Sequence, residues 1–222
     1  MEDGKVMINI VFEDNHLLVV EKPVNIPVQA DSSKDKDFLN LLKEYLKIKY
    51  KKEGNVYLGL VHRLDRPVGG IMVFAKTSKA ASRLSKQIQN GKFKKTYIAV
   101  VEGKINKKGN FIDKLLKDTS KNITTVNPKG KIAKLSYQLL DYKDNLSLVR
   151  INLETGRSHQ IRVQFSSRGH ALYGDQKYNQ NTPKDQIALF ASQIELTHPT
   201  TKEKLTFTLP KPNRYPFNIF NS

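Results

Sequence analysis

Short apolar runs that alternate with polar residues constrain the fold of this chain more than any other feature. In residues 135–139 and 149–153 apolar side chains alternate with other residues, and Asp144-Asn145 between them suits a hairpin turn. The same alternation recurs in residues 205–209, where threonines separate the apolar side chains. Because side chains of a strand point alternately to its two faces, this pattern predicts half-buried strands. We therefore expect a fold in which strands dominate.

Two helices are expected between the predicted strands. Asp37 is a suitable cap for a helix over residues 38–49, where apolar residues recur at helical spacing. Ser78 is expected to cap a second helix that ends at Asn90-Gly91. The regular strand-helix alternation of a parallel doubly wound sheet is missing, so we predict an α+β domain with a mostly antiparallel mixed sheet and inserted helices. The further strands predicted by the pattern are residues 8–12, 17–20, 57–64, 71–76 and 95–101.

The strong positive charge indicates a polyanionic partner. The chain has 38 Lys and Arg against 21 Asp and Glu, a formal net charge of +17, which exceeds what solubility requires. Nucleic acid is the first candidate. Membrane surfaces are also anionic, but the sequence has no lipid-facing amphipathic helix and no apolar run long enough for a signal peptide or a spanning helix. We expect a cytoplasmic protein that binds no membrane.

Several chemistries are excluded by residues and motifs that the sequence lacks. It has no cysteine, which removes disulfides, thiolate metal sites and cysteine nucleophiles. Phosphate-loop, nucleophile-elbow and zinc-helix motifs are missing as well. The five histidines are scattered along the chain, and we expect no metal site.

One carboxylate lies between two guanidinium groups at the end of an apolar run, in Val61-His62-Arg63-Leu64-Asp65-Arg66. Such a cluster is often a structural ion pair that stabilises a turn. It can also keep a partly buried carboxylate ionised, as a nucleophilic Asp requires. A kinase catalytic loop orders Leu and Asp the other way round, and the chain has no Asp-Phe-Gly, so that function is excluded. A hydrolase would need a second carboxylate or an activating histidine, and only His62 is close in sequence.

A second cluster, in residues 153–162, places two arginines beside a glycine. Arg157 and Arg162 carry fork-shaped donors that suit phosphate or carboxylate groups. We expect Ser158 to cap a short helix with an apolar inner face, from whose first turns Arg162 projects. The alternative is a solvated basic helix without a ligand.

The two clusters together resemble the signature motifs of RluA-type pseudouridine synthases, which isomerise uridine in RNA. The matching segments are His62-Arg63-Leu64-Asp65 and Gly156-Arg157-Ser158-His159-Gln160-Ile161-Arg162. Further blocks match in the same chain order, and the similarity spans residues 10–210, nearly the whole chain. These blocks are Glu21-Lys22-Pro23, Pro27-Val28, Lys95-Thr96-Tyr97-Ile98-Ala99, Val101-Glu102-Gly103, Gly169-His170, Gly174-Asp175 and His198-Pro199.

The resemblance implies an α+β catalytic domain with a central cleft that works without a cofactor. Its essential aspartate corresponds to Asp65 in this sequence. Tyr97 is expected to stack on a base that is flipped out of the RNA, and Arg162 is expected to pair with the aspartate. The substrate-binding set implied by the resemblance is Arg63, which would help displace the target nucleotide, with Arg157 and His159.

Two positions depart from the family pattern. Val68-Gly69 precede Gly70, where members commonly carry a small hydroxyl pair before the glycine. Gln164 stands where a histidine is frequent. Both positions lie beside the motifs rather than at the aspartate, so they concern the subfamily and the substrate more than the reaction.

The resemblance also sets expectations for domains and partners. We expect a single catalytic domain over residues 1–222, since no room is left before residue 10 for the separate N-terminal RNA-binding domain that some members carry. The expected substrate is structured ribosomal or transfer RNA, bound by a monomer, with no DNA and no cofactor. Which of Arg157 and Arg162 pairs with Asp65 stays open. The main alternative is a catalytically inactive RNA-binding protein, although binding alone would not require a carboxylate near a polyanion.

Overall fold

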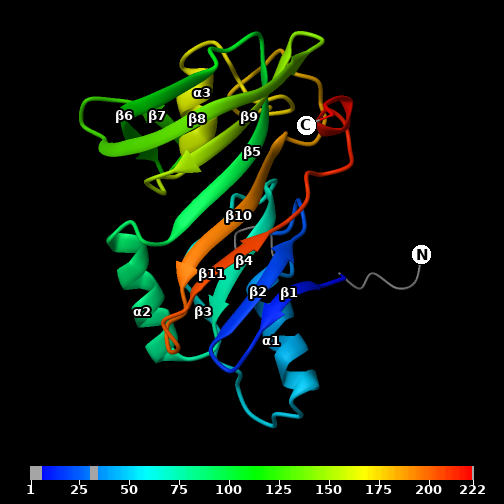
Figure 1. Cartoon of the computed structure of the whole chain (residues 1–222), viewed down its shortest axis with the longest axis vertical. Coiled ribbons are helices and arrows are strands. Elements are labelled where there is room, and N and C mark those ends of the chain that lie inside the picture. Colours follow the sequence, from blue (N-terminus) through cyan, green and yellow to red (C-terminus); the bar gives the residue numbers. More distant parts are fainter. Residues whose placement is uncertain (1–6, 31–34, 222) are drawn as a thin grey trace. The chain divides into compact units, whose positions relative to one another are not determined.

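The computed structural model describes residues 7–30 and 35–221, and in these residues strands dominate (Figure 1). No helix in this part of the chain is long and apolar enough to cross a membrane. The helices are α1 (Phe38–Lys49), α2 (Ser78–Gln89), α3 (Gln160–Ser166) and a 3-10 turn at Phe217–Ile219. The strands are β1 (Asn9–Glu13), β2 (Leu17–Lys22), β3 (Gly59–Leu60), β4 (Gly69–Ala75), β5 (Lys94–Glu102), β6 (Lys108–Asp118), β7 (Ile123–Val126), β8 (Lys131–Lys143), β9 (Leu146–Leu153), β10 (Leu189–Thr197) and β11 (Lys204–Thr208).

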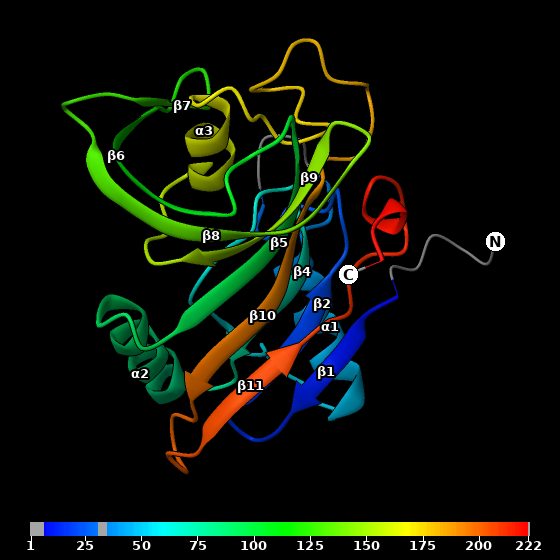
Figure 2. The ribbon, with the colours of Figure 1, turned by 45° about the horizontal axis from the view of Figure 1, so that its top comes forward.

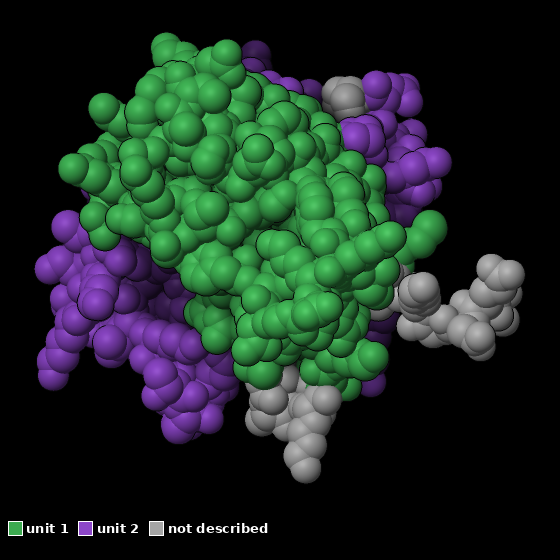
Figure 3. Space-filling model, turned by 90° about the horizontal axis from the view of Figure 1, so that it is seen from below, with its two compact units in different colours: residues 1–93, 194–209 green, residues 94–193, 210–222 purple. Residues whose placement is uncertain are grey.

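The chain forms two compact units, which Figure 3 colours separately. Unit 1 consists of residues 1–93 and 194–209, and unit 2 consists of residues 94–193 and 210–222. Unit 1 is thus assembled from two segments of the chain that a hundred residues separate in sequence. The prediction of a single catalytic domain stays a prediction.

Unit 1 is built on antiparallel pairing of β2 with both β1 and β4. Every side chain of β4 is buried, and Leu17, Leu18, Val19 and Val20 of β2 have no exposed surface, so both faces of this sheet are covered. Helix α1 packs on it through Phe38, whose ring lies 6.2 Å from that of Phe74. Asp37 caps α1 by accepting a hydrogen bond from the backbone N–H of Asn40, as predicted from the sequence.

Unit 2 is built on antiparallel strands in the order β5-β9-β8-β6-β7. Strands β8 and β9 are joined at Asp144 and Asn145, which adopt φ values of 52° and 58°. These left-handed conformations match the right-handed twist of the flanking strands, and Asp and Asn tolerate them well. The hairpin predicted from Asp144-Asn145 is confirmed, and so is the α+β class with a mostly antiparallel sheet.

The short helix α3 fills the concave side of the β6, β7 and β8 strands (Figure 2). Phe165 of α3 contacts Phe111 and Tyr137, with ring centroids 5.0 and 5.5 Å away. Val163 packs with Leu115 and Ala133 on the same side. All residues of α3 from Gln160 to Phe165 are buried, so this helix is a core element and not a solvated basic helix.

The structure corrects several local predictions. Thr77, and not Ser78, caps α2, accepting a hydrogen bond from the backbone N–H of Ala80 at 3.1 Å. The residue before α3 is His159, which makes no side-chain cap, so the predicted cap at Ser158 is wrong. The strand predicted over residues 57–64 shrinks to β3. Strands β6, β7 and β10 were not predicted.

Candidate active site

The six predicted site residues divide between the two units. Arg63 and Asp65 belong to unit 1, where they lie in the connection from β3 to β4. Tyr97, Arg157, His159 and Arg162 belong to unit 2, on β5 and around the start of α3.

Asp65 begins a tight turn that leads into β4. The carbonyl oxygen of Asp65 accepts a hydrogen bond from the backbone N–H of Val68 at 2.9 Å, across the proline in the turn. Arg66 donates to the carbonyl of Asn25 at 3.2 Å and forms an ion pair with Asp35. Arg63 donates to the side chain of Gln29 at 3.4 Å. The two arginines beside Asp65 therefore connect its turn to the loop that follows β2.

A buried lysine holds the same turn by its backbone. The side chain of Lys22 has no exposed surface, and its ammonium donates to the carbonyls of Pro23 at 2.8 Å, Arg66 at 3.1 Å and Val68 at 2.9 Å. Burial lowers the pKa of Lys22 to about 7, while the negative charge of Asp65 raises it. The lysine from the Glu21-Lys22-Pro23 block thus supplies three donors that fix the backbone of the turn.

His62 is used structurally. Its Nε2 accepts a hydrogen bond from the backbone N–H of Val73 at 3.0 Å, and its ring packs 5.3 Å from that of Phe93. The Nε2 lone pair is thus used by a backbone N–H of β4, so His62 is poorly suited to activate Asp65 or a water molecule. This weakens the hydrolase alternative.

In unit 2, Tyr97 is a largely buried residue of strand β5. It pairs with Ile151 of β9 and is 6 % exposed. The pairing of Lys95 with Leu153 places Lys95 on the same face, two residues earlier. A ring fixed by strand pairing at this depth offers a rigid surface for a base, although its predicted stacking role stays a prediction.

The loop before α3 is fixed by the side chain of Gln160. Its Oε1 accepts hydrogen bonds from the hydroxyl of Thr155 at 2.7 Å and from the backbone N–H of Arg157 at 3.0 Å, and its Nε2 donates to the carbonyl of Lys134 at 3.0 Å. Arg157 donates through Nε to the carbonyl of Ile132 at 2.9 Å. The loop is therefore anchored on β8 before the helix begins.

Arg162 is 5 % exposed, and so does not project from the helix as predicted. Its Nε and one terminal nitrogen donate to the two carboxylate oxygens of Asp175, at 2.9 and 2.7 Å. The guanidinium also lies over the ring of Tyr178, 5.2 Å from its centroid. This two-point contact fixes the plane of the guanidinium. The predicted pairing of Arg162 with Asp65 stays a prediction.

His159 adopts a φ of 51°, which is unfavourable for a histidine and marks a constrained position. Its Nδ1 lies 2.7 Å from the hydroxyl of Tyr178, and that hydroxyl accepts the backbone N–H of Thr124 at 2.9 Å. The phenolic proton is then best placed to point at Nδ1, so His159 carries its own proton on Nε2 when neutral. The hydroxyl of Thr124 makes no hydrogen bond within the described residues.

Sequence reasoning missed the residues that support the motifs. Lys22 and Asp175 lie in sequence blocks that resemble the family, which marks them as candidates for a role in the site. The residues that they contact are distant in sequence, so the contacts themselves could not be predicted. Tyr178 and Gln160 carried no separate signal. Gln164, the residue that departs from the family pattern, donates to Asp113 at 2.7 Å and to the carbonyl of Ala133 at 3.4 Å.

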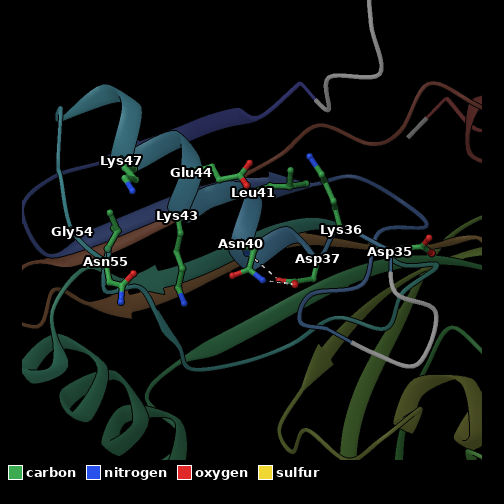
Figure 4. A pocket seen from close by; sticks show the side chains of 11 residues that line it. Asp35, Lys36, Asp37, Asn40, Leu41, Lys43, Glu44, Lys47, Gly54 and Asn55 are labelled. Carbon is green, nitrogen blue, oxygen red and sulfur yellow. Dashed lines mark hydrogen bonds between the residues drawn. The ribbon is translucent and has the colours of Figure 1, made fainter.

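A cavity of about 660 Å³ lies beside α1 in unit 1 (Figure 4). It contains none of the six predicted residues. Its lysines are balanced by an equal number of acidic residues, so it has no preference for anions. Nowhere in residues 7–30 and 35–221 do three His, Asp or Glu side chains gather as metal ligands. The cavity is lined by Asp35, Lys36, Asp37, Asn40, Leu41, Lys43, Glu44, Lys47, Gly54, Asn55 and Val56.

Residues 16–167 match the model of the family described as RNA pseudouridylate synthase. An uncharacterized RNA pseudouridine synthase of Bacillus subtilis is 36% identical over 211 residues, which cover 92% of this chain and 69% of the relative. A ribosomal large subunit pseudouridine synthase D of Vibrio cholerae is 35% identical over 225 residues, covering 93% of this chain and 68% of that protein.

Among solved structures, the human RNA pseudouridylate synthase domain containing 4 is similar in fold. It superposes with a TM-score of 0.78 at 21% identity, covering 92% of this chain and 88% of that one.

Proposed function

The chain belongs to the RNA pseudouridylate synthase family and is an RNA-modifying isomerase, and we propose that it converts specific uridines of structured RNA to pseudouridine with Asp65 as nucleophile. Ribosomal RNA is the first substrate to test, because several relatives, including that of Vibrio cholerae, are named as ribosomal large subunit synthases. Transfer RNA is the second.

The reaction needs no group from outside. The bond from ribose C1′ to uracil N1 breaks, the ring turns, and C1′ bonds to C5; the C5 proton is lost to solvent and N1 gains one. Asp65 would act at C1′, at uracil C6, or by assisting a glycal, and it must be ionised in each case. A stacked uridine has to be extruded first, at a cost of about a few kcal/mol. Tyr97 would then hold the base, Arg162 would pair with the carboxylate, and Arg63, Arg157 and His159 would bind the RNA.

The observation that carries this proposal is the turn that begins at Asp65. Its backbone is fixed by the three hydrogen bonds of the buried Lys22. A nucleophile needs a fixed position, whereas an RNA-binding surface does not.

Release of tritium from uridine labelled at C5 tests the proposal. The native protein should release tritium from unmodified ribosomal or transfer RNA, and Asp65→Asn should release none. Glu53→Gln, which removes one exposed carboxylate of unit 1, is the matched control and should keep full activity. If no RNA releases tritium although the protein binds RNA in a salt-sensitive manner, the chain is a binding protein and the proposal fails.

A further inference from the structure

Lys95 occupies the second position of β5, in the strand that also carries Tyr97. Cross-strand pairing with Leu153 and Ile151 places Lys95 and Tyr97 on the same face. Two residues along a strand span about 7 Å, so the two side chains lie within reach of one nucleotide. The neighbouring Lys94 is exposed and points to the opposite face.

The ammonium of Lys95 lies against the loop that carries Arg157. A methyl group added at Gly156 would come within 3.1 Å of the Nζ of Lys95. A side chain there would require the ammonium to move by a few tenths of an ångström, so the glycine leaves room for the lysine at this position. The ammonium of Lys95 therefore lies close to the backbone of the loop motif.

Among the residues that the structure describes, Lys95 has no partner for its charge. Its ammonium makes no hydrogen bond or ion pair with any described residue, in contrast to Lys22 with its three carbonyls. Burial alone lowers the pKa of Lys95. A half-buried ammonium without a partner destabilises the free protein, and an anion supplied from outside would relieve that cost.

We propose that Lys95 binds a phosphate of the RNA substrate, adjacent to the nucleotide whose base faces Tyr97. The inference rests on the proposed function, because it assigns the lysine to the backbone of that same substrate. Two groups on one face of β5 then bind different parts of the nucleotide. The ring of Tyr97 contacts the base, and the ammonium of Lys95, two residues earlier, binds the phosphate. Phosphate contacts of this kind fix the register of the RNA without reading its sequence.

Paired lysine variants test the assignment. Lys95→Met should lower kcat/KM for RNA by about 10- to 100-fold, as expected for loss of one hydrogen bond to a charged group. Lys94→Met removes the same charge one residue away and should change kcat/KM by less than about two-fold at moderate salt. Lys95→Met should unfold at the same temperature as the native protein or higher, because an unpaired charge is removed. Equal effects of the two variants, or a destabilised Lys95→Met, would overturn the proposal.

Neutral linkages in the RNA locate the phosphate. Substrates with a single methylphosphonate, scanned around the target uridine, should identify one position that weakens the native enzyme. At that position the neutral linkage should have no further effect on Lys95→Met, whereas Lys94→Met should respond like the native enzyme. Additive effects of Lys95→Met and the neutral linkage at every position would contradict a direct contact.

A third measurement keeps this inference separate from the proposed function. The resonance of the Lys95 ammonium, assigned by its loss in Lys95→Met, should titrate at lowered pH in the free protein and shift upward when RNA is added. If no RNA is isomerised but this shift occurs, the proposed reaction fails and the phosphate site stands. If RNA is isomerised and the titration of Lys95 is unchanged by RNA, the phosphate site fails and the reaction stands.

Discussion

The turn of Asp65 and the loop before α3 are held in different ways. In unit 1 a single lysine fixes the turn through backbone carbonyls, which any residue can supply. In unit 2 the guanidinium of Arg162 is fixed by the side chain of Asp175, while Arg157 is fixed through its backbone N–H by Gln160. Backbone support tolerates changes of the neighbouring residues, and side-chain support does not.

This difference explains one departure from the family pattern. Val68 replaces a small hydroxyl residue, yet its contribution to the turn is the carbonyl that Lys22 binds. The substitution therefore leaves the support of Asp65 intact. Gln164, by contrast, acts through its side-chain amide on Asp113.

The largest effect is expected where side chains alone give support. Asp175→Asn removes the charge that compensates the buried guanidinium of Arg162, and should lower the free energy of unfolding by about 3–5 kcal/mol, with loss of isomerisation. Chemical denaturation measures the loss of stability, and tritium release measures the loss of isomerisation. A variant that keeps native stability would show that side-chain support is not essential here.

Lys22→Met tests the backbone support. It leaves the carbonyls of Pro23, Arg66 and Val68 without their donor, so we expect a loss of about 3 kcal/mol in unfolding free energy and of about 100-fold in kcat through displacement of Asp65. Val68→Ala, which keeps the carbonyl, should retain activity despite a loss of packing. If Val68→Ala were as inactive as Lys22→Met, the valine side chain rather than the carbonyl would support the turn.

Glu13 offers a cluster of unit 1 that touches neither motif. It accepts hydrogen bonds from Lys49, Lys76 and Tyr50 at 2.6–2.8 Å. Burial raises the pKa of Glu13, but these hydrogen bonds outweigh burial and lower it from 4.5 to about 2.

Because the folded pKa of Glu13 is depressed, its stabilisation is present above pH 4.5 and is lost as the pH falls towards 2. The unfolding free energies of native protein and Glu13→Gln should therefore differ by about 3 kcal/mol near pH 7, and by progressively less between pH 4.5 and 2. Isomerisation should be unchanged. A constant difference across this pH range would contradict the depressed pKa.

The smallest effect is expected for a single hydroxyl. Tyr178→Phe keeps the ring under Arg162 but removes the hydrogen bonds that the hydroxyl makes with His159 and with the backbone N–H of Thr124, and should cost about 1–2 kcal/mol of stability. In the native protein, ¹⁵N spectra should show Nδ1 of His159 without a proton, and the variant should show a mixture of tautomers. Tyr142→Phe, at an exposed hydroxyl, is the control. An unchanged histidine spectrum would show that the hydroxyl of Tyr178 does not determine the tautomer of His159.

The features that were predicted correctly from the sequence are those that neighbouring residues determine. The cap at Asp37 and the turn at Asp144-Asn145 depend on neighbouring residues only, and both were predicted. The cap of α2 moved by one residue because Thr77 and Ser78 both carry a suitable hydroxyl. Strand β6 was missed because Lys108, Asn110 and Lys114 on its outward face obscure the apolar alternation.

Support of the site could not be predicted, because it is made over long sequence separations. Lys22 meets Arg66 and Val68 more than forty residues later. Arg162 was expected to project because its partner Asp175 lies outside the helix. His159 precedes α3 in a left-handed conformation, where a local reading favoured Ser158 as cap. The resemblance to the family motifs identified candidate site residues, but not the contacts that fix their positions.

The division of unit 1 between residues 1–93 and 194–209 has a consequence for synthesis. The ribosome makes the chain from its amino terminus, so the turn of Asp65 emerges about 130 residues before the segment that completes its unit, which begins at Ile194. In unit 2, strands β6, β7, β8 and β9 can pair as they appear, since their partners are close in sequence. During translation, the pairing of β6, β7, β8 and β9 can therefore form before residues 194–209 complete the unit that holds the turn of Asp65.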